Sequence, residues 1–120
     1  MKNIIAGVVI GKDDGVSIAS GSTLQAISDC DVGDRVYVLT RPEDIALTLA
    51  RDTSSARNVY PGRVTGTVLA GPLVRMKLDC GFPLNVLLTR RSAEEMGLAL
   101  GSEVFASFKA TALRVIKRLD

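Results

Sequence analysis

Short runs of valine, isoleucine and threonine, separated by glycine-bearing breaks, constrain the fold of this 120-residue chain more than any other feature. The breaks fall at residues 12–15, 20–22, 31–34, 70–72 and 80–81. Turns at such short intervals are typical of all-β sandwiches and barrels. We therefore predict an all-β fold of small barrels, with strands at residues 3–10, 15–20, 23–28, 34–40, 43–50, 59–70, 73–79, 83–89, 103–109 and 111–118.

The two halves of the chain resemble each other, which indicates an internal repeat. The matching motifs are Asn3-x-x-x-Gly7 with Asn58-x-x-x-Gly62, Asp29-Cys30 with Asp79-Cys80, and Val32-Gly33-x-x-Val36 with Leu100-Gly101-x-x-Val104. The offset between copies grows along the chain because only the second copy holds an insertion at residues 89–101. We predict two small β units, residues 1–54 and 55–120.

Composition excludes several classes of function. Fifteen Lys and Arg against thirteen Asp and Glu leave a net charge of +2, too small for the basic field that holds nucleic acid. Histidine is absent, which removes the commonest general base and neutral metal ligand, and no nucleophile and base pair is visible. We therefore expect no catalytic residue, no metal site and no cofactor.

Two further absences narrow the choice of function. The chain lacks the G-x-x-x-x-G-K-[ST] phosphate-binding loop, and its apolar runs are shorter than the roughly 18–20 residues of a membrane span. Cys30 and Cys80 have no C-x-x-C spacing. Reduced thiols in a cytoplasmic protein are the expectation, and the sequence leaves a disulfide open.

The insertion at residues 89–101 groups hydroxyls and cations around one short helix. Ser92-Ala93-Glu94-Glu95 has the form of a capping box, so we predict a helix that begins at Ser92 and ends at Gly97 after one or two turns. The N-terminus of a helix favours an anion. The strand predicted at 103–109 delivers Lys109 at its far end, so a cation and the Thr89 and Ser92 hydroxyls could converge.

These motifs together resemble a known family. The motifs are Ser55-Ala56-Arg57-Asn58, Gly62-x-Val64, Thr89-x-x-Ser92-Ala93-x-x-x-Gly97-Leu98-x-x-Gly101-x-x-Val104 and Lys109-Ala110-Thr111. They are similar to the Mop family of molybdate-binding domains, or molbindins, over residues 55–118. The first half, with Val32-Gly33-Asp34-x-Val36 and Arg41-Pro42-Glu43-Asp44, resembles the C-terminal TOBE region that follows the nucleotide-binding domain of ATP-driven (ABC) importers. The whole looks like the C-terminal regulatory domain of a molybdate or tungstate importer's ATPase subunit.

The resemblance implies a fold, a ligand and an assembly. The fold would be an OB-like β-barrel of the TOBE/Mop type with one short helix, swapped or paired in a homodimer or higher homo-oligomer. The ligand would be molybdate or tungstate, held between subunits by eight residues, namely Ser55, Ala56, Arg57, Asn58, Thr89, Ser92, Lys109 and Ala110. Where some relatives carry serine after the lysine, this chain has Ala110, so one donor would be missing.

The chemistry of the ligand agrees with this set of residues. Molybdate and tungstate are dianions near neutral pH, so their oxygens only accept hydrogen bonds. Micromolar affinity requires about 8 kcal/mol, and a hydrogen bond to a charged group contributes roughly 1.5–3 kcal/mol, so some five donors are needed. One segment cannot supply them, which is a second reason to expect residues 55–58 and 89–109 to meet, within a chain or across two.

Three functions remain open at this stage. The first is an intracellular oxyanion sensor attached to an ABC ATPase, with the importer's nucleotide-binding domain and membrane subunits as partners and the inner face of the membrane as its place. The second is a free-standing molybdate storage protein. The third is a dimerisation domain of a sugar or polyamine importer that binds no oxyanion. The sequence does not separate molybdate from tungstate.

Overall fold

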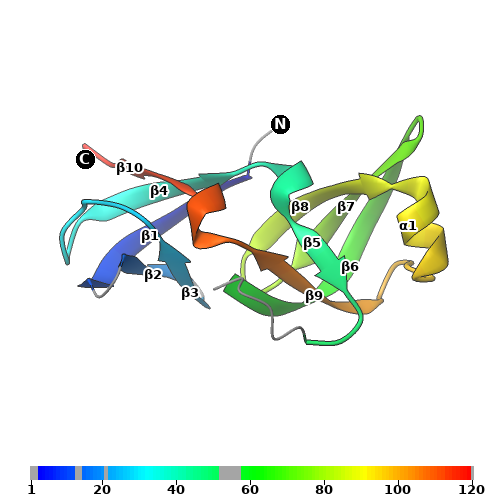
Figure 1. The fold of residues 1–120 in the computed structure, drawn as a ribbon, viewed down its shortest axis with the longest axis horizontal. Coiled ribbons are helices and arrows are strands. Elements are labelled where there is room, and N and C mark those ends of the chain that lie inside the picture. Colours follow the sequence, from blue (N-terminus) through cyan, green and yellow to red (C-terminus); the bar gives the residue numbers. More distant parts are fainter. Residues whose placement is uncertain (1–2, 13–14, 21, 52–57, 120) are drawn as a thin grey trace.

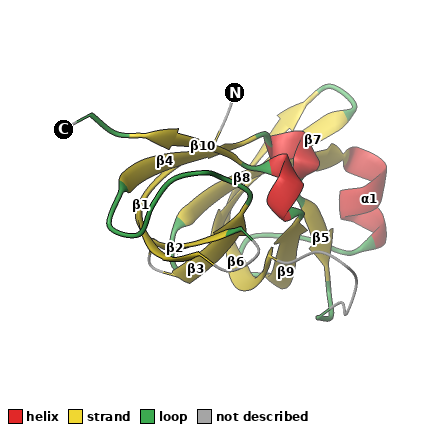
Figure 2. Ribbon diagram, turned by 60° about the vertical axis from the view of Figure 1, so that its left-hand side comes forward, coloured by secondary structure: helices red, strands yellow, loops and turns green. Residues whose placement is uncertain are grey.

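The computed structural model of the chain describes residues 3–12, 15–20, 22–51 and 58–119, which form an elongated body of 42 × 30 × 20 Å (Figure 1). The strands are β1 (Asn3–Lys12), β2 (Val16–Ser20), β3 (Ser22–Ala26), β4 (Arg35–Thr40), β5 (Ala46–Thr48), β6 (Asn58–Ala70), β7 (Leu73–Asp79), β8 (Pro83–Thr89), β9 (Glu103–Phe108) and β10 (Arg114–Lys117). One helix, α1 (Arg90–Glu95), and two 3-10 turns, η1 (Pro42–Asp44) and η2 (Ala110–Ala112), accompany them (Figure 2). The prediction of an all-β chain with one short helix is confirmed.

The strands form two five-stranded antiparallel sheets that exchange one strand each. The first sheet has the order β10-β4-β1-β2-β3, and the second has the order β5-β9-β6-β7-β8. The last strand of the chain thus completes the sheet of the first half, and β5 completes the sheet of the second half. The predicted boundary between residues 54 and 55 falls outside the described residues. The described strands show that each unit borrows an edge strand from the other half.

The internal repeat is visible in the hydrogen bonds of the backbone. The pairing of β1 with β2 shifts register after Val9, and the pairing of β6 with β7 shifts register after Val64. Gly33 donates its N–H to the carbonyl of Val9, and Gly101 does the same to Val64, both at 2.8 Å. Both glycines have a positive φ, +95° and +87°, which a side chain would strain. The repeated Val-Gly motifs therefore fix the same turn in each unit.

The glycines of the Asn-x-x-x-Gly motif are needed for a different reason, because neighbouring atoms lie too close to leave room for a Cβ. A Cβ on Gly7 would lie 2.5 Å from Cγ2 of Ile18, and a Cβ on Gly62 would lie 2.6 Å from Sγ of Cys80. Real Cβ atoms do not approach other heavy atoms so closely. Each glycine lets its long strand lie directly against a core side chain of the neighbouring strand or of the turn that follows it.

The asparagines of the same motif join the two units. Asn3 donates from Nδ2 to the Asn85 carbonyl (2.8 Å) and accepts the Asn85 N–H at Oδ1 (2.7 Å). Asn58 makes the equivalent pair with the backbone of Gln25, both bonds at 2.8 Å. The Tyr60 hydroxyl lies 2.7 Å from Oδ1 of Asn58. Each asparagine therefore forms hydrogen bonds with the free backbone groups of an edge strand of the opposite unit, β8 or β3, and these bonds hold the two barrels together.

The core follows the alternation of the strands. Every second residue of β4 and β7 is buried, and the buried residues of β1 and β6 also lie on one side of each strand, as expected for strands with one face on a barrel interior. The fully buried large side chains are Ile18, Leu24, Met76, Leu78, Leu84, Val9, Val16, Val36, Val38, Val64, Val86 and Val104. Among the described residues no helix is long and apolar enough to cross a membrane.

Two predicted strands are shorter than expected. The strands predicted at 43–50 and 111–118 are β5 and β10, each preceded by a 3-10 turn. Pro42 opens η1 because its fixed φ suits the first turn of a helix and it lacks the N–H that a ladder requires. In η2 the Ala112 N–H donates to the Lys109 carbonyl at 2.9 Å. These turns redirect the chain from one sheet into the other.

Candidate functional site

The two predicted hydroxyl ligands, Thr89 and Ser92, lie together at the start of α1. Oγ1 of Thr89 accepts the backbone N–H of Ser92 at 3.1 Å and donates to Oγ of Ser92 at 2.9 Å. Thr89 is exposed and Ser92 is half-buried. Thr89 uses its own hydroxyl proton on Ser92. The Ser92 hydroxyl proton is therefore the one that the pair can donate to a ligand that arrives from solvent.

The start of the helix corrects the sequence prediction. The N-cap is Thr89 and not Ser92, and α1 begins at Arg90. Thr89 ends β8 in an extended conformation (φ −73°, ψ 149°), and the next residue is tied to the Pro72 carbonyl (2.9 Å), so the helix begins as soon as the strand stops. Glu95 does not reach back to a cap. It pairs with Arg91 at 3.1 Å, one turn earlier.

The end of the helix agrees with the sequence prediction. Gly97 has φ +63° and donates its N–H to the Glu94 carbonyl, while Leu98 donates to the Ala93 carbonyl, both at 3.0 Å. This pair of bonds is the Schellman motif, in which a left-handed glycine satisfies the last carbonyls of a helix. It turns the chain so that Leu98 packs against the core.

Lys109 lies away from the hydroxyl pair. It is the residue before η2, its side chain is exposed, and no described carboxylate lies within ion-pair distance of it. Figure 1 shows η2 near the middle of the long axis and α1 at one end. Within one chain the structure therefore brings Thr89 and Ser92 together but does not bring Lys109 to them. Ala110, beside Lys109, is buried.

The Ser-Ala-Arg-Asn motif is described only at its last residue. Ser55, Ala56 and Arg57 lie outside the described residues. Asn58 is 0% exposed, and its amide is used by the Gln25 backbone and the Tyr60 hydroxyl. In this arrangement Asn58 holds the two units together, with a side chain that is fully buried. The eight residues as a ligand set remain a prediction.

The described residues also show what other chemistry the chain offers. No group of three or more Cys, Asp or Glu side chains among them could hold a metal ion. Both cysteines are free thiols, and burial, with the Asp79 carboxylate nearby, raises the pKa of Cys80 to about 11. The Cys80 thiol is therefore protonated near neutral pH and is a poor nucleophile.

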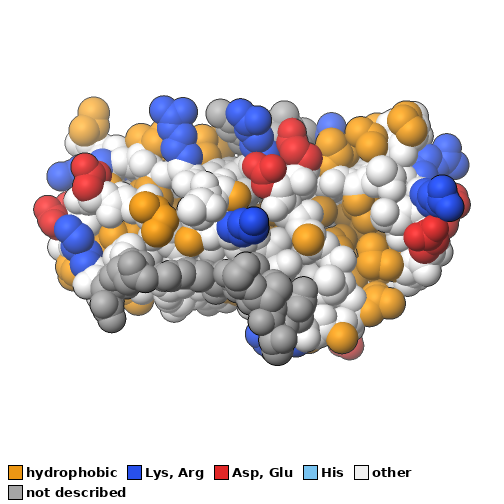
Figure 3. Space-filling model, in the orientation of Figure 1, with side chains coloured by type: hydrophobic (Ala, Val, Ile, Leu, Met, Phe, Trp, Pro, Cys, Tyr) orange, Lys and Arg blue, Asp and Glu red, His pale blue; other side chains and the backbone are white. Residues whose placement is uncertain are grey.

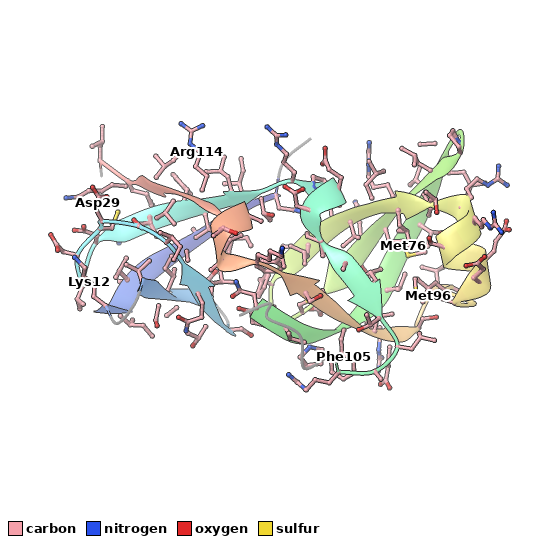
Figure 4. The ribbon with its side chains drawn as sticks, viewed as in Figure 1. Lys12, Asp29, Met76, Met96, Phe105 and Arg114 are labelled. Carbon is pink, nitrogen blue, oxygen red and sulfur yellow. The ribbon has the colours of Figure 1, made fainter. Side chains whose placement is uncertain are left out.

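An apolar groove adjoins α1, and the sequence analysis missed it. Its volume is about 310 Å³, and it is lined by Thr67, Leu69, Val74, Met76, Arg90, Ala93, Glu94, Gly97, Leu98, Ala99 and Leu100. Figure 3 shows hydrophobic side chains gathered at this end of the molecule, and Figure 4 labels Met76 beside the helix. The signal in the sequence was Leu69, which follows Val68 and so breaks the alternation of the strand predicted at 59–70, and Leu100, which lies in no predicted strand; both side chains are exposed. The groove suits an apolar side chain and not an anion.

Comparison with known proteins identifies the family. The sequence model of the TOBE domain matches residues 54–115, which is more than half of the chain. The chain belongs to the TOBE domain family. This TOBE chain is 39% identical over 115 residues to the molybdate/tungstate import ATP-binding protein WtpC of Pyrococcus horikoshii, covering 95% of this chain and 32% of that protein.

Two other relatives give the same picture. The molybdenum import ATP-binding protein ModC 1 of Azotobacter vinelandii is 32% identical over 120 residues, covering 92% of this chain and 33% of that protein. The TOBE chain thus spans about a third of the length of these relatives. The crystal structure of the cytoplasmic molybdate-binding protein ModG with molybdate bound superposes with a TM-score of 0.84 at 21% identity, covering 94% of both chains. This likeness establishes that the two chains share a fold.

Proposed function

We propose that this TOBE chain binds molybdate or tungstate in the cytoplasm and acts as the oxyanion-sensing regulatory domain of an ABC importer's ATPase subunit. The observation that carries the proposal is the solvent-accessible Thr89 and Ser92 hydroxyl pair, in a chain whose relatives include the ATP-binding proteins of molybdate and tungstate import. Hydroxyl and ammonium donors suit a dianion that only accepts hydrogen bonds.

The separation of the donors supports a site completed by a second copy. Lys109 is exposed and has no ion-pair partner among the described residues, and it lies away from α1. A dianion that binds Lys109 of one copy and accepts the Ser92 hydroxyl proton of the Thr89 and Ser92 pair of another would hold the two copies in one arrangement. An attached ATPase domain would read that arrangement as a signal that the oxyanion is abundant. The module itself would bind and not catalyse.

Isothermal titration with molybdate, tungstate and sulfate, with the solution mass measured alongside, tests the proposal. We expect saturable heat with the first two and none with sulfate. Lys109→Ala should weaken binding about 10- to 100-fold, since a hydrogen bond to a charged group contributes about 1.5–3 kcal/mol. Lys77→Ala, at an exposed lysine on β7, is the matched control and should bind as the wild type does. Absence of heat with every ion would refute the proposal and favour a docking domain.

Ser92→Ala separates ligand binding from helix capping. The cap is the acceptor Oγ1 of Thr89 on the Ser92 backbone N–H, so the substitution removes one hydroxyl and keeps the cap. We expect the affinity for molybdate to fall while the unfolding temperature changes little. Unchanged affinity would remove Ser92 from the site.

A free-standing molybdate storage protein is the second candidate. The observation behind it is the shared fold with ModG, which is a cytoplasmic molybdate-binding protein. An antibody against this chain, used on an extract of the source cells, distinguishes the two. A band at the size of 120 residues supports storage, and a band about three times that size supports the importer subunit.

A further inference from the structure

The apolar groove beside α1 lies between two walls that backbone hydrogen bonds hold in place. One wall is the β6/β7 hairpin, and the other is α1 with residues 97–100 (Figure 1). At one end the Arg90 N–H donates to the Pro72 carbonyl at 2.9 Å, and at the other the Gly101 N–H donates to the Val64 carbonyl at 2.8 Å. The groove is therefore formed before a ligand arrives, which lowers the cost of binding.

The floor and rim of the groove are mostly apolar. Thr67 lies opposite Met76, and Leu69 lies opposite Val74, in the register of β6 and β7. Met76 and Val74 are buried, whereas Leu69 and Leu100, one on each wall, are 65% and 68% exposed. At about 310 Å³ the groove is at the small end of the range for ligand sites, which is about 300–1,000 Å³. Its size suits a small molecule with one apolar side chain.

Two charged side chains of opposite sign also line the groove, and both come from α1. Arg90 and Glu94 are four residues apart, so they lie on one face of the helix, about 6 Å apart along its axis. Both are exposed, and neither has an ion-pair partner among the described residues. The other described residues that line the groove carry no charge.

The next pair along the helix behaves differently. Arg91 and Glu95 are also four residues apart, and they form an ion pair of 3.1 Å with each other. Neither of them lines the groove. The helix therefore presents one pair of charges that neutralise each other in solvent and one pair, Arg90 and Glu94, that is available to a ligand in the groove.

We propose that the groove binds a free apolar α-amino acid as its zwitterion. The Arg90 guanidinium donates hydrogen bonds to the carboxylate of the amino acid, and the Glu94 carboxylate accepts from its ammonium group. A side chain of the size of leucine or methionine lies against Val74 and Met76 and is removed from water. An uncharged ligand would leave both charges of α1 unused, and a simple anion or cation would be repelled by one of them. A zwitterion is the class of ligand that uses the whole lining.

This site is separate from the one in the proposed function. It uses the side chains of Arg90 and Glu94 and none of the backbone N–H groups at the start of α1, and the Arg90 N–H is already bound to Pro72. It also requires no oxyanion and no second copy of the chain. A test in the absence of molybdate and tungstate therefore leaves the proposed function untouched if it fails.

Titration of the whole chain with L-leucine, followed by methyl NMR, tests the proposal. The methyl groups of Leu69, Met76 and Leu100 should shift in a saturable way at leucine concentrations up to about 10 mM. N-acetyl-leucine lacks the ammonium group and leucinamide lacks the carboxylate. Each should bind about threefold or more weakly than leucine, since each loses one charged partner.

Two substitutions assign each charge to its partner. Arg90→Gln should weaken the binding of leucine about threefold or more but leave that of leucinamide unchanged, because leucinamide has no carboxylate. Glu94→Gln should weaken the binding of leucine to a similar extent but leave that of N-acetyl-leucine unchanged. The matched control is the double variant Arg91→Gln with Glu95→Gln, at exposed positions on the same helix outside the groove, and it should bind leucine as the wild type does.

Three outcomes would overturn the proposal. The first is the absence of saturable shifts with leucine, methionine and phenylalanine. The second is equal affinity for leucine, N-acetyl-leucine and leucinamide, since the groove would then bind apolar groups without using its charges. The third is a control double variant that loses as much affinity as Arg90→Gln does, since the effect would then come from the net charge of the helix.

Discussion

Removing the Asn58 amide should destabilise the protein more than most single substitutions do. The side chain is 0% exposed and makes two hydrogen bonds of 2.8 Å to the backbone of Gln25, and the Tyr60 hydroxyl lies 2.7 Å from its oxygen. Asn58→Ala leaves the Gln25 N–H and carbonyl without partners, at about 1–3 kcal/mol each. With the small cavity added, we expect a loss of about 3–5 kcal/mol in the free energy of unfolding.

Urea denaturation measures this loss. For a chain of this size a loss of about 4 kcal/mol lowers the midpoint by roughly 2 M. Asn3→Ala breaks the equivalent pair of bonds to Asn85 and should cost about 2–4 kcal/mol, since no tyrosine is involved. Gln25→Ala is the control, because the clamp uses the Gln25 backbone and not its side chain, and it should cost less than about 1 kcal/mol. A loss below about 1 kcal/mol for Asn58→Ala would show that water replaces the amide and would refute the reasoning.

Two further predictions concern buried groups. Thr40 is 2% exposed and its hydroxyl has no hydrogen-bond partner among the described residues, so Thr40→Val should raise the free energy of unfolding by about 1–2 kcal/mol in the same urea assay. Burial raises the pKa of Cys80 from 9.0 to about 11, so the folded state keeps a proton that the unfolded chain releases. Stability should therefore fall as the pH rises from about 9 to 11, by on the order of 2–3 kcal/mol, and Cys80→Ala should flatten that dependence in denaturation curves at pH 8 and 10.5.

The strands could be predicted from the sequence, but their pairing could not. Alternation of apolar and polar residues shows which side of a strand is buried, and it carries no information about which strand lies next to it. Both β5 and β10 follow a 3-10 turn, and the alternation reads the same whether such a strand returns to its own sheet or crosses to the other. The exchange depends on where η1 and η2 point, which tertiary packing decides.

The candidate site shows the same limit at the level of single residues. Thr89 and Ser92 could each cap a helix, and the capping-box rule favoured Ser92 because Glu95 follows it. The structure decides for Thr89 because β8 ends there in an extended conformation. The Ser-Ala-Arg-Asn motif singled out Asn58 as a ligand residue, but only the structure shows that its amide is turned inward onto the backbone of Gln25.

The exchange of edge strands has a consequence for synthesis of the chain. Residues near the N-terminus generally fold first as a chain leaves the ribosome. Here β4 must wait for β10, which follows every other described strand in the sequence, before the first sheet has all its members. Until then the β4 edge offers unpaired N–H and carbonyl groups, and a β10 from a neighbouring nascent chain could pair with them. Chains made side by side on one message would therefore be the ones at risk of exchanging their β10 strands.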